Sequence, residues 1–320
     1  MIQSFTVTNP NGKSMVCDLA NPWKEGLAVA SIEGLGPGQA TINVADISSM
    51  DGGLFNSARR GTRNIVISLI FVQHDTLSIE DLRRKCYTYF PLKKNIKLKF
   101  TTNNEKVNND FFIDGYVESN EPNIFSSSEG SAISIICPNP YFYKSVTQEN
   151  RFSISSNPDF SFAFSKVPSN NNELLMGDIV SYIVSNVYYE GDADTGIVLE
   201  IVFKSNVEYD SENPKYITIN NSLNDTRNEV SLNKIKELVD AQLEEYTGIV
   251  AGDKIILSTT KGEKYVTYVH DNISYNVLSA IKPSGEWVCL TQGLNYLVIN
   301  KDGDIEITAS VKNKIYYYGV

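Results

Sequence analysis

The sequence predicts a mainly β protein of two domains, with one α-helix in the first domain and a short helix inserted in the second. The chain has 320 residues, which is more than a single domain of ordinary size contains. It holds 18 Tyr and 14 Phe, and aromatic residues favour strands. Short runs of alternating polar and apolar residues recur between Gly, Pro, Asn and Asp, as in sheets whose strands are joined by turns.

Eight segments of the first domain have the pattern of strands. They are residues 4–8, 15–17, 27–32, 40–47, 64–72, 95–101, 111–118 and 132–137. Most of them alternate polar and apolar side chains, which is typical of a strand with one buried face. Residues 64–72 are apolar at nearly every position, which predicts a central strand covered on both faces.

One helix is predicted between these strands. Ser78 and Asp81 have the spacing of a capping box at a helix N-terminus, with Asp in place of the usual Glu or Gln. Apolar residues then recur at helical spacing at Ile79, Leu82, Cys86, Tyr89 and Phe90. Pro91 cannot continue a helix, so we expect the helix to end just before it.

A domain boundary is predicted near residue 145. Pro138, Asn139 and Pro140 end the last strand of the first half, and residues 141–172 show only weak periodicity. Residues 1–145 contain 14 Lys/Arg and 14 Asp/Glu, whereas residues 146–320 contain 14 and 24, a net charge of −10. This change of surface indicates two domains, 1–145 and 146–320.

The second domain is predicted to be a β-sandwich, because many short strands follow one another closely. The expected strands are residues 178–187, 197–204, 216–220, 254–259, 264–270, 285–290, 295–300, 304–311 and 314–318. Residues 232–246 differ, since Leu232, Ile235, Val239 and Leu243 recur at helical spacing. We expect a short amphipathic helix there.

Composition argues against several functions. No run of apolar residues approaches the length needed to span a bilayer, and the first ten residues lack the features of a signal peptide. We therefore expect synthesis in a cytoplasm and no membrane insertion. The acidic half is a poor candidate for binding nucleic acid, because phosphates repel it. Four separated cysteines indicate buried free thiols, with a disulfide or a metal site as the alternatives.

The sequence contains no recognisable catalytic constellation. The two histidines, His74 and His270, have no Ser or Cys nearby in the context of a nucleophile, and phosphate-binding and metalloprotease motifs are missing. We therefore expect no catalytic residues, no cofactor and no metal. Trp287 with Asn295 is a weak candidate for contacting a sugar, although both equally fit a strand in the core.

Two glycine-rich loops of the first domain are candidates for contacts between subunits. Such loops carry few bulky side chains, so they can lie flat against a neighbour. A small basic cluster close by could meet carboxylates of the same neighbour. Leu54 and Phe55 are either interface residues or part of their own core. The candidates are Gly34, Leu35, Gly36, Pro37, Gly38, Asp51, Gly52, Gly53, Leu54, Phe55, Arg59, Arg60 and Arg63.

Seven ordered blocks of the first domain resemble phage distal tail (Dit-like) proteins of the siphophage tail component family. The blocks are residues 32–38 (IEGLGPG), 51–57 (DGGLFNS), 63–67 (RNIVI), 82–91 (LRRKCYTYFP), 115–118 (GYVE), 121–126 (EPNIFS) and 133–142 (ISIICPNPYF). Parts of the second domain are also similar to that family's galectin-like sandwich, in residues 191–196, 252–253, 261–262, 287–295 and 318–320. The helix at 232–246 departs from that pattern.

The resemblance implies a structural role at the tip of a phage tail. The first domain would form a six-fold ring that joins the tail tube to the baseplate or tail hub, and the galectin-like second domain would point outward. The implied partners are further copies of the chain, the tail tube protein, the tail hub or tail-associated lysin, receptor-binding or baseplate proteins, and the tape measure protein. The alternative is a carbohydrate-binding module that contacts the host cell wall. A galectin-like fold is not by itself evidence for sugar binding. A tail-associated hydrolase lacks any supporting motif.

Overall fold

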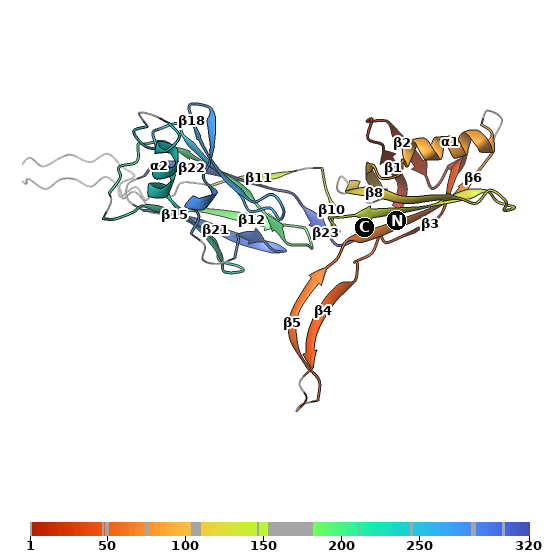
Figure 1. Ribbon diagram of the computed structural model, residues 1–320, viewed down its shortest axis with the longest axis horizontal. Helices are drawn as coiled ribbons and strands as arrows, with labels where there is room; N and C mark the ends of the chain where they lie inside the picture. Colours follow the sequence, from red (N-terminus) through yellow and green to blue (C-terminus); the bar gives the residue numbers. More distant parts are fainter. Residues whose placement is uncertain are drawn as a thin grey trace, which may run out of the picture. The chain divides into compact units, whose positions relative to one another are not determined.

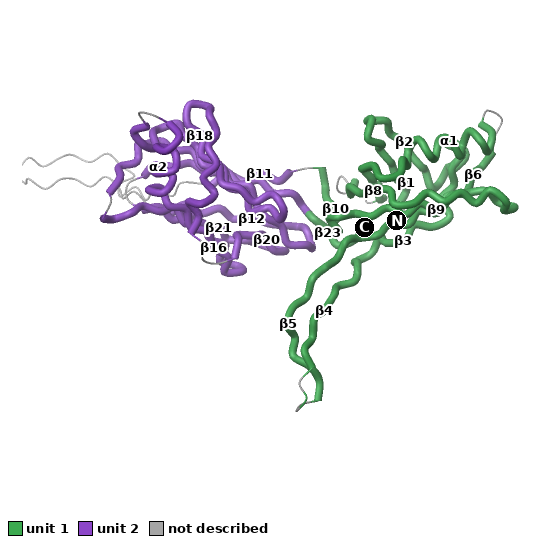
Figure 2. The backbone as a smooth tube through the Cα atoms, viewed as in Figure 1, with its two compact units in different colours: residues 1–145, 316–320 green, residues 146–315 purple. Residues whose placement is uncertain are grey.

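The computed structural model describes the chain apart from residues 1, 47, 49–50, 74–76, 104–109, 146, 153–181, 211, 244–245, 283–285 and 303–304. The described residues form mostly strands and two α-helices (Figure 1), so the predicted mainly β fold class is confirmed. They divide into two compact units (Figure 2): unit 1 is Met1–Ser145 with Tyr316–Val320, and unit 2 is Val146–Ile315. No helix in this described part is long and apolar enough to cross a bilayer.

Unit 1 is built on a nine-stranded antiparallel sheet whose main order is β2-β1-β7-β8-β9-β6-β3. Its strands are β1 (Ile2–Thr8), β2 (Ser14–Asp18), β3 (Leu27–Glu33), β6 (Arg63–Phe71), β7 (Asn95–Thr102), β8 (Asp110–Pro122), β9 (Gly130–Cys137), β10 (Phe142–Tyr143) and β23 (Tyr316–Tyr317). A 3₁₀-helix, η1 (Pro22–Lys24), precedes β3. Strands β4 (Ala40–Asp46) and β5 (Gly53–Arg60) form a separate two-stranded sheet.

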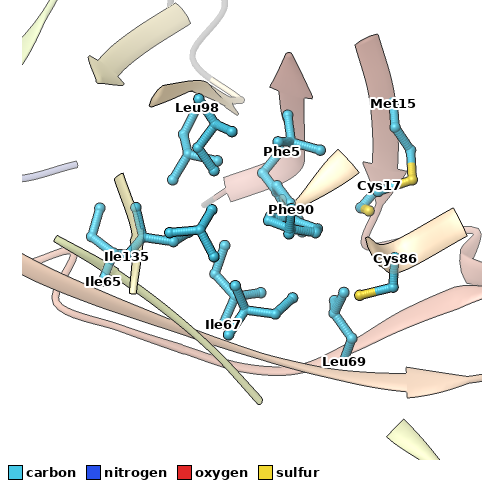
Figure 3. Close-up of a cluster of buried hydrophobic side chains, with 14 of the residues drawn as sticks. Phe5, Met15, Cys17, Ile65, Ile67, Leu69, Cys86, Phe90, Leu98 and Ile135 are labelled. Carbon is cyan, nitrogen blue, oxygen red and sulfur yellow. The ribbon is translucent and has the colours of Figure 1, made fainter. Parts of the chain in front are cut away.

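The core of unit 1 lies on one face of the nine-stranded sheet. Ile65, Ile67 and Leu69 of β6 point toward Phe5 and Phe90 in this core (Figure 3). The prediction that this strand is covered on both faces is wrong, because the intervening residues of β6 are exposed or half-buried. Apolar side chains on that second face include Ile70, which is 37% exposed. The near-continuous apolar run therefore has only one face in the core of its own subunit.

Helix α1 (Ile79–Tyr89) covers this core and begins as the sequence predicts. The hydroxyl of Ser78 accepts a hydrogen bond from the backbone N–H of Asp81, and the Asp81 carboxylate accepts one from the backbone N–H of Ser78. The Ser78 hydroxyl also donates to the Asp81 carboxylate at 2.7 Å, and this bond, together with that from the Ser78 backbone N–H, lowers the pKa of Asp81. Leu82 and Cys86 are the buried residues of the helix, and Pro91 follows its C-cap.

Unit 2 contains two larger antiparallel sheets, as expected for a sandwich. The six-stranded sheet has the order β11-β22-β14-β17-β18-β19, and the four-stranded sheet has the order β12-β21-β15-β16. The strands of the first are β11 (Gln148–Arg151), β14 (Val198–Phe203), β17 (Lys254–Ser258), β18 (Tyr265–His270), β19 (Ile273–Asn276) and β22 (Ile307–Asn313). The strands of the second are β12 (Tyr182–Tyr189), β15 (Tyr216–Asn221), β16 (Thr226–Ser231) and β21 (Gly293–Lys301). The shorter elements are β13 (Thr195–Gly196), β20 (Cys289–Leu290) and η2 (Leu278–Ala280).

The inserted helix of unit 2, α2 (Leu232–Asp240), is shorter than predicted. It begins after Ser231, whose hydroxyl accepts a hydrogen bond from the backbone N–H of Lys234. It ends at Asp240, where a negative side chain opposes the helix dipole and no basic residue offsets it. The backbone N–H of Leu243 still reaches the carbonyl of Val239 in the turn beyond.

The last five residues lie with unit 1, although the sequence analysis assigned them to the second domain. Strand β23 pairs with β10 through Phe142 with Tyr317 and Tyr143 with Tyr316. The ring of Phe111 meets that of Tyr317 edge-on, with centroids 5.1 Å apart. These pairings hold the C-terminal residues on the first unit, so the chain of unit 2 is inserted between two neighbouring strands of unit 1.

Candidate assembly surface

The β4–β5 hairpin is the most exposed ordered element of unit 1 among the residues described. It extends away from the rest of unit 1 (Figure 1), and every residue of its two strands is exposed or half-buried. Four large apolar side chains lie on it: Ile42 is 60% exposed, Val44 54%, Leu54 58% and Phe55 62%. Leu54 and Phe55 are therefore not part of the core of their own subunit, which was the alternative left open by the sequence.

The two faces of the hairpin differ in chemistry. Residues directly opposite one another in an antiparallel ladder share a face, and the register pairs Ile42 with Ala58 and Val44 with Phe55. The register shifts next to Val44, so that Phe55 stands opposite Val44. On the other face the amide of Asn43 donates a hydrogen bond of 3.0 Å to the hydroxyl of Ser57. One face therefore carries Ile42, Val44 and Phe55, while the other carries this polar pair together with Leu54, which stands opposite Ala45.

This ribbon does not bury enough surface to be stable by itself. An isolated two-stranded hairpin is marginal in water, and each large apolar side chain gains about 1.5–3 kcal/mol when it is fully buried. The sequence analysis singled out Leu54 and Phe55 but missed Ile42 and Val44. The alternation of polar and apolar side chains at residues 40–47 could have indicated that Ile42 and Val44 share one face.

The first glycine loop packs against its own chain. Gly34 has φ of +83°, and a Cβ there would lie 2.1 Å from the carbonyl oxygen of Asn64, so only glycine fits. The backbone N–H of Val320 donates to the carbonyl of Leu35 at 3.1 Å. Gly36, Pro37 and Gly38 are exposed, so part of the predicted contact surface remains accessible.

Arg63 is buried inside unit 1 and is not a surface residue, which corrects the sequence-based assignment. It is 5% exposed. Its guanidinium donates to the carbonyls of Pro140 and Gly36, both at 2.7 Å, and to those of Gly34 and Tyr318. With its donors committed to backbone carbonyls, Arg63 cannot meet a carboxylate of a neighbour.

The other two arginines of the basic cluster lie at the base of the hairpin. The guanidinium of Arg60 lies over the ring of Tyr318, 3.9 Å from its centroid, and 5.8 Å from that of Tyr141. Arg59 is exposed. At the far end, Asp51 and Gly52 are exposed in the turn, which continues into Gly53 of β5, and Gly52 has φ of +95°. Of the three arginines, Arg59 alone is both exposed and on the hairpin.

The weak sugar candidate is not supported by the geometry. Asn295 is fully buried. Its side-chain amide donates to the carbonyls of Thr291 and Gly293, and its oxygen accepts from the backbone N–H of Thr291 and the amide of Asn221. Asn295 therefore holds a turn together. Trp287 is half-buried, with the ammonium of Lys264 4.7 Å from its ring centroid.

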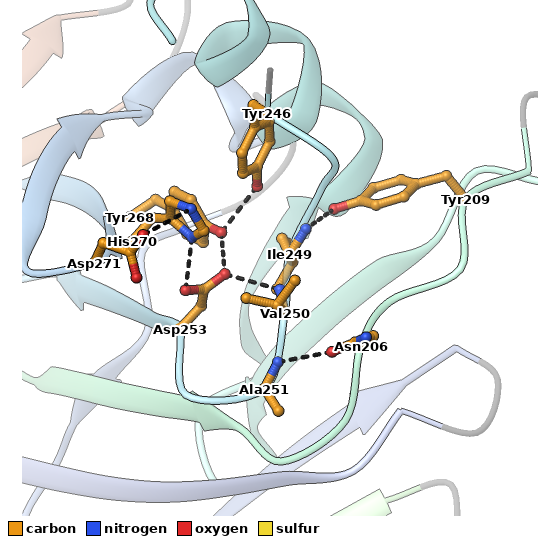
Figure 4. A network of polar contacts seen from close by, with 10 residues as sticks. All are labelled: Asn206, Tyr209, Tyr246, Ile249, Val250, Ala251, Asp253, Tyr268, His270 and Asp271. Atoms are coloured by element: carbon orange, nitrogen blue, oxygen red, sulfur yellow. Dashed lines mark hydrogen bonds and ion pairs between the residues drawn. The ribbon is translucent and has the colours of Figure 1, made fainter. Parts of the chain in front are cut away.

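A buried polar network in unit 2 surrounds Asp253 (Figure 4). The Asp253 carboxylate accepts from the hydroxyl of Tyr268 and from the backbone N–H of Val250 at 2.8 Å, and it lies 2.9 Å from Nδ1 of His270. The hydroxyl of Tyr246 lies 2.9 Å from that of Tyr268. Burial and these contacts raise the pKa of Tyr268. The network joins segments of unit 2, and we see no nucleophile in it.

Within the described ranges no group of three or more His, Cys, Asp or Glu is arranged to hold a metal ion. Cys17, Cys86, Cys137 and Cys289 are free thiols; the first three are buried as predicted, whereas Cys289 is only half-buried. The remaining histidine of the sequence analysis, His74, lies outside the described residues.

The fold is similar to that of a solved phage tail protein. No family model and no curated protein sequence matches the chain. The crystal structure of the Dit protein of phage SPP1, described as a paradigm of the hub adsorption apparatus in phages that infect Gram-positive bacteria, is similar. It has a TM-score of 0.57 at 12% identity over 98% of each chain. The resemblance predicted from the sequence is therefore confirmed for the fold.

Two structures of the activated phage p2 baseplate, with Sr and with Ca, also match. Their TM-scores are 0.41 and 0.42 at 13% identity, over 97% and 98% of each chain respectively.

Proposed function

We propose that this protein is a structural component of a phage tail tip, in which copies of unit 1 form a ring between the tail tube and the baseplate or tail hub. The observation that carries the proposal is the fold shared with SPP1 Dit across nearly the whole of both chains. The exposed apolar face of the β4–β5 hairpin supports assembly, because water is an unfavourable environment for it.

The proposed contact is the face of the hairpin that carries Ile42, Val44 and Phe55, set against a neighbouring copy. Arg59 stands opposite Thr41 on the other face of the ribbon, where it could meet a carboxylate of a second surface. Gly36, Pro37 and Gly38 and the turn at Asp51 offer further exposed backbone for the same interface. The other proposed partners are the tail tube protein, the tail hub or tail-associated lysin, receptor-binding or baseplate proteins and the tape measure protein. Unit 2, expected from the resemblance to be galectin-like, would face outward at the virion tail tip. The role requires no enzymatic activity and no cofactor.

The test is the oligomeric state of the purified full-length chain, measured by native mass spectrometry and negative-stain imaging. A closed ring of six copies with a central hole is expected. Ile42→Ser and Phe55→Ser should each weaken ring formation at least tenfold. A tenfold change in affinity corresponds to about 1.4 kcal/mol, and burial of one such apolar side chain contributes more than that. The melting temperature of the isolated subunit should hardly change, because both side chains are exposed in it.

Ile273→Ser is the matched control for Ile42→Ser. Ile273 is an isoleucine of strand β19 in unit 2 and is 56% exposed, close to the 60% of Ile42. Rings should form normally in this variant. A chain that stays monomeric at all concentrations would refute the ring, and rings that form equally well with Ser at residues 42 and 55 would refute the hairpin as the contact.

A further inference from the structure

The outward face of strands β12 and β21 carries no charged residue. The two strands lie side by side in the four-stranded sheet of unit 2, paired from Tyr182 with Asn300 to Tyr189 with Gly293 (Figure 1). Charged residues make up 21% of the chain, so an uncharged patch of this size on an acidic unit is a distinctive surface. The eight outward positions are Tyr182, Val184, Asn186, Tyr188, Leu294, Tyr296, Val298 and Asn300.

Tyrosine and asparagine alternate across the two strands. Tyr182 stands opposite Asn300, and Tyr296 stands opposite Asn186. The tyrosines are well exposed: Tyr182 is 45% exposed, Tyr296 44% and Tyr188 64%. The two pairs are four residues apart along β12, which corresponds to about 13 Å at the rise of a strand. The face therefore repeats an aromatic ring beside an amide over a length that several sugar units would span.

The polar groups of these pairs are available to a ligand. Among the described residues, the side chains of the three tyrosines, Asn186 and Asn300 make no hydrogen bond or ring contact, whereas many other polar side chains of unit 2 are committed. The backbone carbonyl of Tyr188 accepts a hydrogen bond from the side-chain amide of Gln148. The opposite face of the same strands is fixed in the core, with the side chain of Asn295 bonded to the carbonyls of Thr291 and Gly293. The inner face of β12 and β21 is thus fixed in the core, while none of the described side chains bonds to the polar groups of the outer face.

We propose that this face of β12 and β21 binds a neutral glycan chain, a role that goes beyond the assembly function proposed above. Exposed tyrosine rings present flat apolar surfaces against which sugar rings can lie, and their hydroxyls and the neighbouring amides can hydrogen-bond sugar hydroxyls. Unit 2 has a net charge of −10, so an anionic polymer is repelled. The lack of charge on the face itself gives an uncharged polymer the better match.

Binding is tested with the full-length chain on an array of neutral hexasaccharides, including cellohexaose, maltohexaose and chitohexaose, with affinities from titration calorimetry. At least one neutral hexasaccharide should bind, with little dependence on salt. Tyr182→Ala, Tyr296→Ala and Asn186→Ala should each weaken binding about tenfold or more. Tyr265→Ala is the matched control, because Tyr265 is 39% exposed on β18 of the other sheet, and it should bind as the unmodified chain does.

Three outcomes would overturn the glycan site. They are no binding to any neutral glycan at millimolar concentration, binding that survives Tyr182→Ala with Tyr296→Ala, and rings or tail particles that fail to assemble in that double variant. The last outcome would identify the face as a protein-docking surface. Ring formation by the unmodified chain is measured in parallel, so failure of the assembly proposal and failure of the glycan site are distinguishable.

Discussion

Replacing Arg63 by alanine should destabilise unit 1 more than any other single change in its basic cluster. The guanidinium donates to four backbone carbonyls, which come from the glycine loop, from Pro140 and from Tyr318 of the C-terminal segment. Hydrogen bonds to a charged group contribute roughly 1.5–3 kcal/mol each, but four bonds from one side chain are not additive. We expect a loss of about 3–5 kcal/mol, because buried carbonyls are left without their charged donor. A unit of this size should then melt roughly 10 °C lower.

The assay is calorimetric melting, with hydrogen exchange at β6 and β9 to place the effect in unit 1. Arg63→Lys should recover little of the loss, because one ammonium lacks the planar fork that reaches several acceptors. Arg59→Ala is the control, since Arg59 is exposed and surface changes usually shift stability by less than about 0.5 kcal/mol. If Arg63→Ala melts within about 2 °C of Arg59→Ala, the four hydrogen bonds do not stabilise the unit as argued.

Three further predictions concern the C-terminal strand, the buried thiols and the Asp253 network. Deletion of Tyr316–Val320 should lower the melting temperature of unit 1 by several degrees, because β23 pairs with β10 and β10 pairs with β8. Unchanged hydrogen exchange in β8 would contradict this prediction. Burial raises the pKa of Cys17 and Cys137 to about 12. These thiols therefore ionise at lower pH in the unfolded chain, and the free energy of unfolding should fall as the pH rises above about 9. A thiol reagent should modify the half-buried Cys289 before either of them. Tyr268→Phe removes a donor to a buried carboxylate and should cost about 1–3 kcal/mol by urea unfolding, whereas a loss below about 0.5 kcal/mol would show that the Asp253 network is not stabilising.

Local patterns in the sequence predicted the elements of the fold well. The capping box at Ser78 and Asp81 placed the first helix, because both partners lie within one turn of each other. Strands such as β7 and β21 were predicted because alternation along a strand reflects a single buried face. The second helix was predicted too long, since periodicity does not include the unfavourable acidic end at Asp240.

Local patterns did not predict the contacts between segments that are far apart in the sequence. Arg63 bonds to Tyr318, which is 255 positions later, so nothing near Arg63 indicates that it is buried. The place of the C-terminal strand, and the bond of Asn295 to Asn221, likewise depend on partners far away in the sequence. Exposure of the β4–β5 hairpin was also not predictable, because the same alternation would suit a strand inside a sheet.

The base of the hairpin is tightly bonded, whereas the ribbon beyond it is exposed, and both properties favour the proposed assembly. The base is held tightly, with Arg63 bonded to the carbonyls of Gly34 and Gly36 and Arg60 stacked on Tyr318. The ribbon beyond it buries almost nothing. A firmly held base sets the direction of the ribbon before any partner arrives, which reduces the conformational entropy lost on binding. One neighbouring surface is enough to cover the face with Ile42, Val44 and Phe55, and a ring in which each subunit extends one hairpin over the next supplies that surface. Leu54, opposite Ala45, lies on the other face of the ribbon.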